Sequence, residues 1–368
     1  MAQWRAARPA VVRGPAVLTS VRGRFARSKR RVALILVIAL GLGPSTWLRS
    51  DWAERGPLAM QVRAIATDLP ASAGGPVTRL GLWELTSPRR QFYGFSAMVT
   101  LSGGNLRAFT DGGWRLTFAP PGNPSRETQF NRVLTTPEFA GRIPDTESAT
   151  RDPKTGTYWL GYENFHAIGR FSIASRVEAM QVPPEFAGWP VNSGNEAMER
   201  LADGRFIVLP ENDDAARIWS GDPLAGAENV AFRFEPPPGF RPTELKQLPD
   251  GRVLILLRHI DWAGLGSVWP PFTAKLVIAD PATIRAGEPW AWEMLADLDA
   301  ILPRENYEAL ALWPEDDGSV TLWVMSDDNH AAVQRTLLAK LRFRPAHPPN
   351  KKGAADEPGA PLNSPKDE

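Results

Sequence analysis

Residues 306–329, NYEALALWPEDDGSVTLWVMSDDN, decide the fold class. An apolar segment leads into the turn Asp-Asp-Gly at 316–318, and a second segment of strand composition follows at 320–324. An Asp-Gly pair supplies the positive φ that a tight hairpin requires, and Val, Thr, Leu and Trp favour a pleated strand. The stretch therefore predicts a β-hairpin. It has an acid, Glu308, near its start and three polar residues at its end, Asp327, Asp328 and Asn329.

Four further segments share this pattern of polar start, apolar strand, glycine-containing turn, second strand and polar end. They are GFSAMVTLSGGNLRAFTDGG (94–113), DTESATRDPKTGTYWLGYEN (145–164), GNEAMERLADGRFIVLPEND (194–213) and PTELKQLPDGRVLILLRHID (242–261). Their starts are separated by 51, 49, 48 and 64 residues when marked by Ser96, Glu147, Glu196, Glu244 and Glu308. A period near fifty residues with short turns indicates β-propeller blades and excludes helical repeats.

The predicted fold is thus an all-β propeller spanning residues 60–344. Six blades are expected, with five as the alternative. In the six-blade arrangement the flanking segments 62–69, 78–87 and 336–344 combine into the sixth blade. The C-terminal strand would then pair beside N-terminal strands, so that the ring closes without a long exposed edge.

The ends of the chain differ from the propeller in composition. Residues 1–31 are basic, and an uncharged apolar run that could extend over 32–48 follows them. This order predicts an N-terminal hydrophobic helix that is either a cleaved signal peptide or a membrane anchor. The positive segment should stay inside while the domain is exported to the periplasm or another extracytoplasmic space. The alternative is a core helix behind a disordered basic arm. Residues 345–368, rich in Pro, small and charged residues, predict a disordered tail.

The overall charge of +1 conceals an acidic domain. Ten Lys and Arg and no acid lie in residues 1–50, which leaves 32 Lys and Arg against 41 Asp and Glu in the rest. A nucleic-acid partner is therefore not expected, because it requires a basic face. The chain has no Cys, so disulfides, thiolate metal sites and Cys nucleophiles are excluded.

The acids of the hairpins are expected to converge, because a hairpin returns to the side that it left. Glu308 should lie near Asp327, and by the same rule Glu147 near Glu163, Glu196 near Glu211, and Glu244 near Arg258. The first strand of each propeller blade lines the central channel, so these groups should ring one mouth of that channel. Like charges at such distances disfavour ionisation. A hard cation such as Ca²⁺, which prefers carboxylate and amide oxygens, would offset the repulsion. Turn capping and local ion pairs are the alternative.

Several of these motifs resemble the phytase-like family, whose members are described as having esterase-like activity and as β-propellers. The resemblance spans about residues 60–344 and rests on GFSAMVTLSGGNLRAFTD, GNEAMERLADGRFIVLPE, ENYEALALWP and SDDNHAAVQRTLL. It implies a propeller, an extracytoplasmic setting and hydrolysis of an ester or phosphoester. One departure is Thr110-Asp111-Gly112-Gly113, where the family tends to have Ser-Asp-Arg-Gly. The resemblance carries over to Asn195, Glu196, Asn306, Glu308, Asp327, Asp328, Asn329, Gln334 and Arg335.

These lines of reasoning predict an exported or membrane-anchored, metal-assisted hydrolase of a small anionic ester, phosphoester or lactone. Glu308 or Glu196 would act as general base, and Arg335 or Arg258 would contact substrate oxygens. The alternative is a non-catalytic binding or structural propeller of the cell envelope, because nucleophile-elbow, zincin and nucleotide motifs are missing from the sequence. The predicted Ca²⁺ ligands are Glu147, Asn195, Glu196, Asn306, Glu308, Asp327, Asp328 and Asn329.

Overall fold

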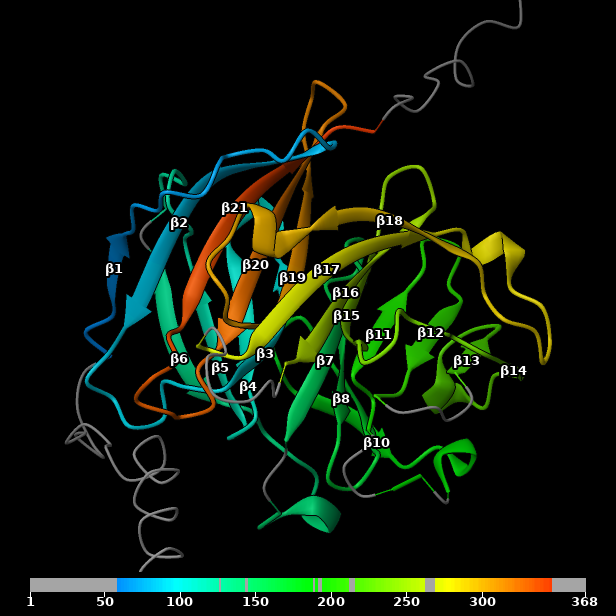
Figure 1. Ribbon diagram of the computed structural model, residues 1–368. Helices are drawn as coiled ribbons and strands as arrows, with labels where there is room; N and C mark the ends of the chain where they lie inside the picture. Colours follow the sequence, from blue (N-terminus) through cyan, green and yellow to red (C-terminus); the bar gives the residue numbers. More distant parts are fainter. Residues whose placement is uncertain are drawn as a thin grey trace, which may run out of the picture. The chain divides into compact units, whose positions relative to one another are not determined.

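The protein is an all-β propeller of five blades in the part of the chain that its computed structural model describes (Figure 1). The predicted N-terminal segments 1–31 and 32–48, and the predicted tail except for its first residue, lie outside that part. Among the described residues, no helix is long and apolar enough to cross a membrane. The described residues are 58–125, 127–142, 145–187, 189–190, 194–211, 216–261 and 269–345.

Four blades are antiparallel sheets of four strands that follow one another in chain order. Blade 1 comprises β3 (Phe95–Thr100), β4 (Leu106–Thr110), β5 (Trp114–Phe118) and β6 (Thr128–Arg132). Blade 2 comprises β7 (Thr146–Arg151), β8 (Tyr158–Tyr162), β9 (Ile168–Phe171) and β10 (Val177–Gln181). Blade 3 comprises β11 (Ala197–Arg200), β12 (Phe206–Leu209), β13 (Ala216–Trp219) and β14 (Asn229–Phe232). Blade 4 comprises β15 (Arg241–Gln247), β16 (Val253–Ile260), β17 (Phe272–Ala279) and β18 (Trp292–Asp297).

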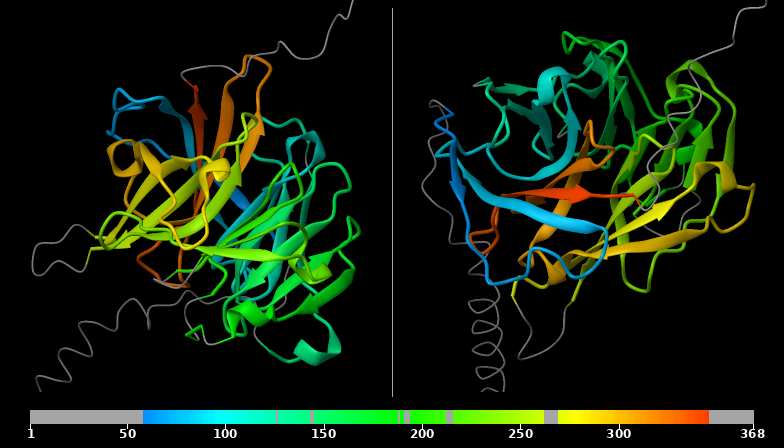
Figure 2. Two further views of the ribbon diagram at one scale, coloured as in Figure 1. Left: turned by 90° about the vertical axis from the view of Figure 1, so that its right-hand side faces the viewer. Right: turned by 90° about the horizontal axis from the view of Figure 1, so that it is seen from above.

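Blade 5 joins the two ends of the domain and corrects the expectation of six blades. Its five strands lie in the order β1 (Gln61–Ala64), β2 (Val77–Thr86), β21 (Leu337–Phe343), β20 (Val320–Asp327) and β19 (Asn306–Pro314). Strand β21 pairs with both β2 and β20. The flanking strands therefore complete the sheet of the last hairpin and form no sixth blade. Figure 2 shows the blue N-terminal strand beside the red C-terminal strand. The predicted closure by terminal strands is confirmed.

The first strand of each blade is the innermost, and β3, β7, β11, β15 and β19 gather at the centre of Figure 1. Each of these five strands contacts the inner strands of the two neighbouring blades, which closes the ring. The connections contain short 3-10 turns. These are η1 (Ser102–Gly104), η2 (Pro137–Phe139), η3 (Pro184–Phe186), η4 (Pro223–Ala225), η5 (Pro281–Thr283) and η6 (Leu298–Ala300).

The apolar core is divided into five clusters, one between each pair of adjacent blades. Phe109 of blade 1 and Tyr158 of blade 2, for example, belong to one cluster, and Met98 of blade 1 and Trp323 of blade 5 belong to another. The other three clusters join blades 2 and 3, 3 and 4, and 4 and 5. Burial of apolar faces between sheets therefore stabilises every interface of the ring.

The predicted Asp-Gly hairpins are confirmed at the junction of the first two strands in blades 3, 4 and 5. Gly204, Gly251 and Gly318 have φ values of 95°, 95° and 80°, in the left-handed region that glycine adopts without steric cost. The preceding Asp accepts a hydrogen bond from the backbone two residues later, as from Arg252 to Asp250 at 3.1 Å. These turns place the ends of the inner strands on one face and their starts on the other.

Candidate functional site: an acidic mouth on the propeller axis

The start of each inner strand carries one side chain outside the regular pairing, at a β-bulge in four of the five blades. The pairing between the first two strands shifts by one residue at this point in blades 1, 2, 4 and 5. In blade 3, Glu196 has the corresponding place directly before Ala197, where the ladder with β12 begins. A bulge re-aims a side chain and ends regular pairing locally. The residues at this position are, in blade order, Ser96, Glu147, Glu196, Thr243 and Glu308.

A second set of side chains comes from the far end of the second strand in each blade. Asp111 donates its backbone N–H to the carbonyl of Gly94, and Glu163 does the same to Asp145, each at 2.9 Å. These contacts extend the hairpins by one pair beyond the bulge. The residues at this position are, in blade order, Asp111, Glu163, Glu211, Arg258 and Asp327. The two sets therefore contribute seven carboxyl groups and one guanidinium. With Asp145 they form what we call the acidic mouth.

Arg258 is the only cation among these residues, and it links three blades. Its guanidinium lies 3.2 Å from Glu211 of blade 3 and 3.7 Å from Glu308 of blade 5. Burial alone would lower its pKa, but Glu308, Glu211, Glu196 and Glu147 raise that pKa above its ordinary value. The acids of blades 2, 3 and 5 thus converge on one guanidinium.

Several carboxyl groups of the mouth have raised pKa values, because they are buried and close together. Burial, with a further contribution from Glu308, raises the pKa of Asp111 to about 8. Burial, Asp145 and Glu211 raise the pKa of Glu163 to about 7. Burial followed by neighbouring acids also raises the pKa values of Glu147, Glu196 and Asp327 well above the usual range. Desolvation and like charge act in the same direction here.

Two groups of carboxyl oxygens lie close enough to hold a cation. Asp145, Glu147 and Glu163 form one triad, and Glu163, Glu196 and Glu211 form the other. In each triad one oxygen from every member lies within 4.8 Å of the others. Glu163 belongs to both triads, so it stands between two adjacent candidate cation positions of blades 2 and 3. Carboxylate oxygens in such numbers suit Ca²⁺ better than a soft metal.

Glycine permits this close approach of blades 2 and 3. A Cβ atom at Gly194 would lie 2.5 Å from the Cα of Glu163 and 2.7 Å from its Cγ. Any side chain at residue 194 would therefore displace the carboxylate that the two triads share. Gly194 directly precedes Asn195 and Glu196, the two predicted ligands of blade 3. The site therefore requires a residue without a side chain at this position.

Four of the predicted ligands lie in the acidic mouth itself, namely Glu147, Glu196, Glu308 and Asp327. Two of the three predicted asparagines, Asn195 and Asn306, are completely buried beside it. Asn306 donates its amide to Glu308 at 2.8 Å, and Asn195 donates to the carbonyl of Ala167 in blade 2 at 3.1 Å. The amide oxygen of each accepts no hydrogen bond from the described part of the chain.

The remaining predicted residues organise the loop that follows β20. Asp328 accepts backbone hydrogen bonds from Gly94 at 3.3 Å and His330 at 3.0 Å, which ties this loop to blade 1. Asn329 donates its backbone N–H to Asp327 at 2.7 Å and its side-chain amide to Gln334 at 2.8 Å. The bond from the Asn329 backbone holds one oxygen of the Asp327 carboxylate in place.

The two predicted arginines differ in position. Arg335 pairs with the buried Glu305 at 2.7 Å, which holds it beside the start of β19, whereas Arg258 contacts the acids of the mouth directly. The expected proximity of Glu244 to Arg258 is wrong. Glu244 pairs with Leu256 in the ladder, one residue beyond the bulge, and its carboxylate contacts Lys246 at 2.7 Å.

Sequence reasoning left four acids of the mouth out of the predicted ligand set: Asp111, Asp145, Glu163 and Glu211. Three of them, Asp111, Glu163 and Glu211, lie at the end of a second strand. The hairpin pattern placed each of these acids near the start of the first strand of its own hairpin. Asp145 had no such signal, because it precedes its strand and has a left-handed backbone with φ of 47°. Its position became evident only from its pairing with Glu163.

Fold and site together define a class of protein, a five-bladed β-propeller with an acidic mouth on its axis. The sequence matches the family model described as "Phytase-like: Esterase-like activity of phytase" over residues 90–330. The chain belongs to this phytase-like family. The matched region runs from the residues before blade 1 into blade 5 and contains every residue of the acidic mouth.

Comparison with curated proteins gives no match. Among solved structures, the Malassezia sympodialis allergen Mala s 1 is 12% identical with a TM-score of 0.42, over 80% of this chain and 91% of that chain. A luciferin-regenerating enzyme is 9% identical with a TM-score of 0.41, over 77% of this chain and 95% of that chain. Likeness at this level supports no argument about function or blade number.

Proposed function

We propose that this phytase-like propeller is a metal-assisted hydrolase of a small anionic ester, phosphoester or lactone. The observation that supports it best is the sharing of Glu163 by two carboxylate triads. A hard cation bound there would relieve the repulsion and the burial that raise the pKa of Glu163 to about 7. Ca²⁺ is the ion that we favour, because the candidate ligands are all oxygen atoms.

In this proposal, Asp145, Glu147, Glu163, Glu196 and Glu211 would hold the cation, which when bound would polarise the carbonyl or phosphoryl oxygen of the substrate. Glu308 or Glu196 accepts a proton from water as the water oxygen bonds to the carbonyl carbon or phosphorus. The bond to the leaving oxygen then breaks, and the carboxyl group returns the proton to that oxygen. Burial raises the pKa of Glu308 while Arg258 opposes the increase, which keeps this acid available as a base.

Arg258 is the better candidate for contacting substrate oxygens. It faces the acids of three blades and donates to Glu211 at 3.2 Å, whereas Arg335 is held by Glu305. A guanidinium offers five N–H donors in a planar fork that suits carboxylate and phosphate oxygens. Arg258 could therefore keep its pair with Glu211 and still bind an anionic group.

The same arginine favours a second candidate function, a binding or structural propeller without catalysis. Arg258 already places one positive charge among four acids, so part of the repulsion is offset without any ion. In that case the mouth would hold neighbouring blades together, and a bound cation would only strengthen the ring.

Turnover distinguishes the two functions. The purified protein should hydrolyse 4-nitrophenyl acetate or 4-nitrophenyl phosphate with added Ca²⁺ and lose this activity in EDTA. Glu308→Gln should reduce kcat at least about a hundredfold, as expected for loss of a general base. Glu288→Gln, an identical change at an exposed position outside the mouth, should leave kcat unchanged. Equal rates for parent and Glu308→Gln would overturn the hydrolase and leave the binding propeller.

We also propose that the domain acts outside the cytoplasm, because the basic segment 1–31 and apolar segment 32–48 have the order of an export signal or anchor. A periplasmic alkaline phosphatase reporter fused after Phe343 should be active. Activity of a cytoplasmic reporter alone at the same position would contradict export.

A further inference from the structure

A cavity of about 370 Å³ lies where the inner strands end, at the opposite mouth of the channel. The last residue of every inner strand lines it, so all five blades contribute. We call this cavity the distal mouth. These last residues are Thr100, Arg151, Arg200, Gln247 and Pro314.

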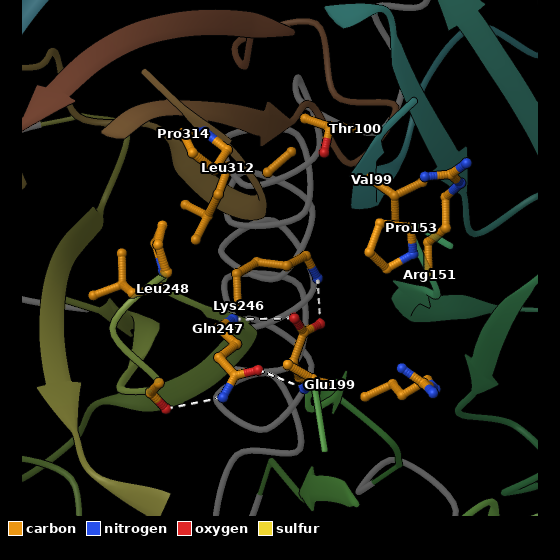
Figure 3. A pocket seen from close by; sticks show the side chains of 15 residues that line it. Val99, Thr100, Arg151, Pro153, Glu199, Lys246, Gln247, Leu248, Leu312 and Pro314 are labelled. Carbon is orange, nitrogen blue, oxygen red and sulfur yellow. Dashed lines mark hydrogen bonds and ion pairs between the residues drawn. The ribbon is translucent and has the colours of Figure 1, made fainter. Parts of the chain in front are cut away.

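The floor of the distal mouth is a network in which one cation, Lys246, faces two buried acids (Figure 3). Lys246 contacts Glu244 at 2.7 Å and Glu199 at 4.0 Å, and donates to the carbonyl of Ala149 at 2.7 Å. Glu199 also accepts from the backbone of Gln247 at 3.0 Å. These contacts occupy the Lys246 ammonium, so that it is not the group that would bind a ligand.

The wall of the distal mouth contains two arginines whose donors are mostly unused. The guanidinium of Arg151 forms no hydrogen bond or ion pair with any residue in the described parts of the chain. Arg200 reaches Asp152 only at 3.7 Å and the carbonyl of Leu201 at 3.4 Å. Each guanidinium has five N–H donors, and half-buried donors without partners are unfavourable.

Further arginines lie near Arg151, whose own pKa is lowered by burial while Asp152 opposes this effect. Arg107 of β4 feels repulsion from both Arg115 and Arg151, which adds to the effect of burial in lowering its pKa. Arg107 and Arg115 have polar partners of their own, Thr117 at 3.0 Å and Tyr158 at 3.4 Å. Arg151 is the member of this group that faces the cavity, and an anion there would relieve the repulsion.

Apolar side chains line the remainder of the cavity. Figure 3 shows Leu248 and Leu312 on one side of the opening and Val99 and Arg151 on the other. The cavity volume is within the range that proteins use for small ligands. An apolar wall next to an unpartnered guanidinium is suited to a molecule with an apolar body and one anionic end.

We propose that the distal mouth is a binding site for a small amphipathic carboxylate, separate from the acidic mouth. The carboxylate would accept hydrogen bonds from Arg151 and Arg200, and the apolar body would pack against Leu248, Leu312 and Val99. This site does not depend on hydrolysis at the acidic mouth, and its ligand need not be the substrate.

Octanoate is a suitable probe, and calorimetric titration of the full chain at low salt tests the site. Octanoate should bind with one-to-one stoichiometry, and octan-1-ol at least about tenfold more weakly, because only the carboxylate can form charge-assisted hydrogen bonds. Affinity should rise up to about fourfold for each methylene added between butyrate and octanoate.

Substitutions of Arg151 test whether octanoate binds at the distal mouth. Arg151→Gln should weaken octanoate binding at least about tenfold, and Arg151→Lys should retain part of it, since charge without the planar fork remains. Arg132→Gln changes an exposed arginine on the outermost strand of blade 1 and should have no effect. Neither change at Arg151 removes a hydrogen bond, so both proteins should fold. Equal binding by parent and Arg151→Gln, equal binding of octanoate and octan-1-ol, or no binding in the millimolar range would overturn the proposal.

Discussion

The two mouths of the channel are formed by opposite ends of the same five strands, and they differ in how their charged side chains are paired. At the distal mouth, the buried acids Glu244 and Glu199 share Lys246, and the guanidinium of Arg151 forms no hydrogen bond or ion pair with the residues that the structure describes. At the acidic mouth, bulges direct several carboxyl groups toward one guanidinium, and the unmatched charge is negative. The channel is therefore polarised, with one end suited to cations and the other to anions.

The largest effect is expected when the cation of the distal floor is removed. Lys246→Met keeps the length of the side chain but leaves the completely buried Glu244 without its partner. Breaking a buried ion pair costs about 3–5 kcal/mol of unfolding free energy. Urea unfolding at about pH 9, above the pKa of about 8 to which burial raises Glu244, should show this loss, and Ca²⁺ should not restore it. A loss below about 1 kcal/mol would show that the floor is not a structural ion pair.

Removal of the cation at the acidic mouth should have a smaller and reversible effect. Arg258→Met should cost about 3 kcal/mol in EDTA, the lower end of the range, because acids with raised pKa values can stay protonated. Added Ca²⁺ should recover most of the loss by binding among the same carboxylates. If calcium affects Lys246→Met and Arg258→Met equally, the two mouths do not differ as described.

The pH dependence of stability should combine both mouths. The pKa of Asp111 is raised by burial and Glu308 to about 8, and that of Glu244 by burial, against Lys246, to about 8. Folded protein then keeps protons that the unfolded chain releases near 3.8 and 4.5, so stability falls as pH rises toward 8. In EDTA the unfolding free energy should therefore fall continuously between about pH 5 and pH 8.

Ca²⁺ and two substitutions separate the contributions to this pH dependence. Glu163→Gln, which changes the acid shared by both candidate cation positions, should flatten the part that Ca²⁺ also removes, and Glu244→Gln should flatten a part that Ca²⁺ leaves intact. Urea midpoints across this pH range would measure both effects. Stability that rises with pH in EDTA would contradict the raised pKa values.

The smallest effect concerns a hydroxyl that links blades at the distal floor. Thr150 donates to Glu199 at 2.8 Å and accepts from the backbone of Arg200 at 2.9 Å. Thr150→Val keeps the shape, removes both bonds, and should lower the unfolding free energy by about 1 kcal/mol. Calcium affinity should be unchanged, which calorimetry can verify. A change in calcium affinity would mean that the two ends of the channel are coupled.

The periodicity of the sequence was sufficient to locate the five hairpins, but it did not determine the number of blades. Glycine-containing turns between apolar segments located five first-and-second strand pairs correctly, three of them through an Asp-Gly pair. Pairing between β2 and β21 depends on backbone hydrogen bonds between the two ends of the domain, which have no local signature in the sequence. The flanking strands were therefore counted as a blade of their own.

The sequence identified the side chains at the starts of the inner strands, but it could place them only to within one residue along each strand. Glu147, Glu196 and Glu308 occupy one equivalent position, whereas Glu244 lies one residue past it and turns to the floor, with Thr243 at the bulge. A shift of one residue in a strand reverses the direction of the side chain. Sequence alone does not reveal a bulge, so the fourth acid of the repeat was assigned to the wrong mouth.

Direct calcium titration of the acidic mouth tests the central claim most simply. The parent protein should bind Ca²⁺ at pH 7.5, and saturation at about a hundred times Kd should stabilise the fold by about 2.7 kcal/mol. Glu163→Gln removes the carboxylate shared by both triads, and should abolish most of the binding heat and of this stabilisation. Glu288→Gln should behave as the parent does. If Glu163→Gln and the parent bind calcium with the same affinity, or neither binds it, the acidic mouth is not a cation site.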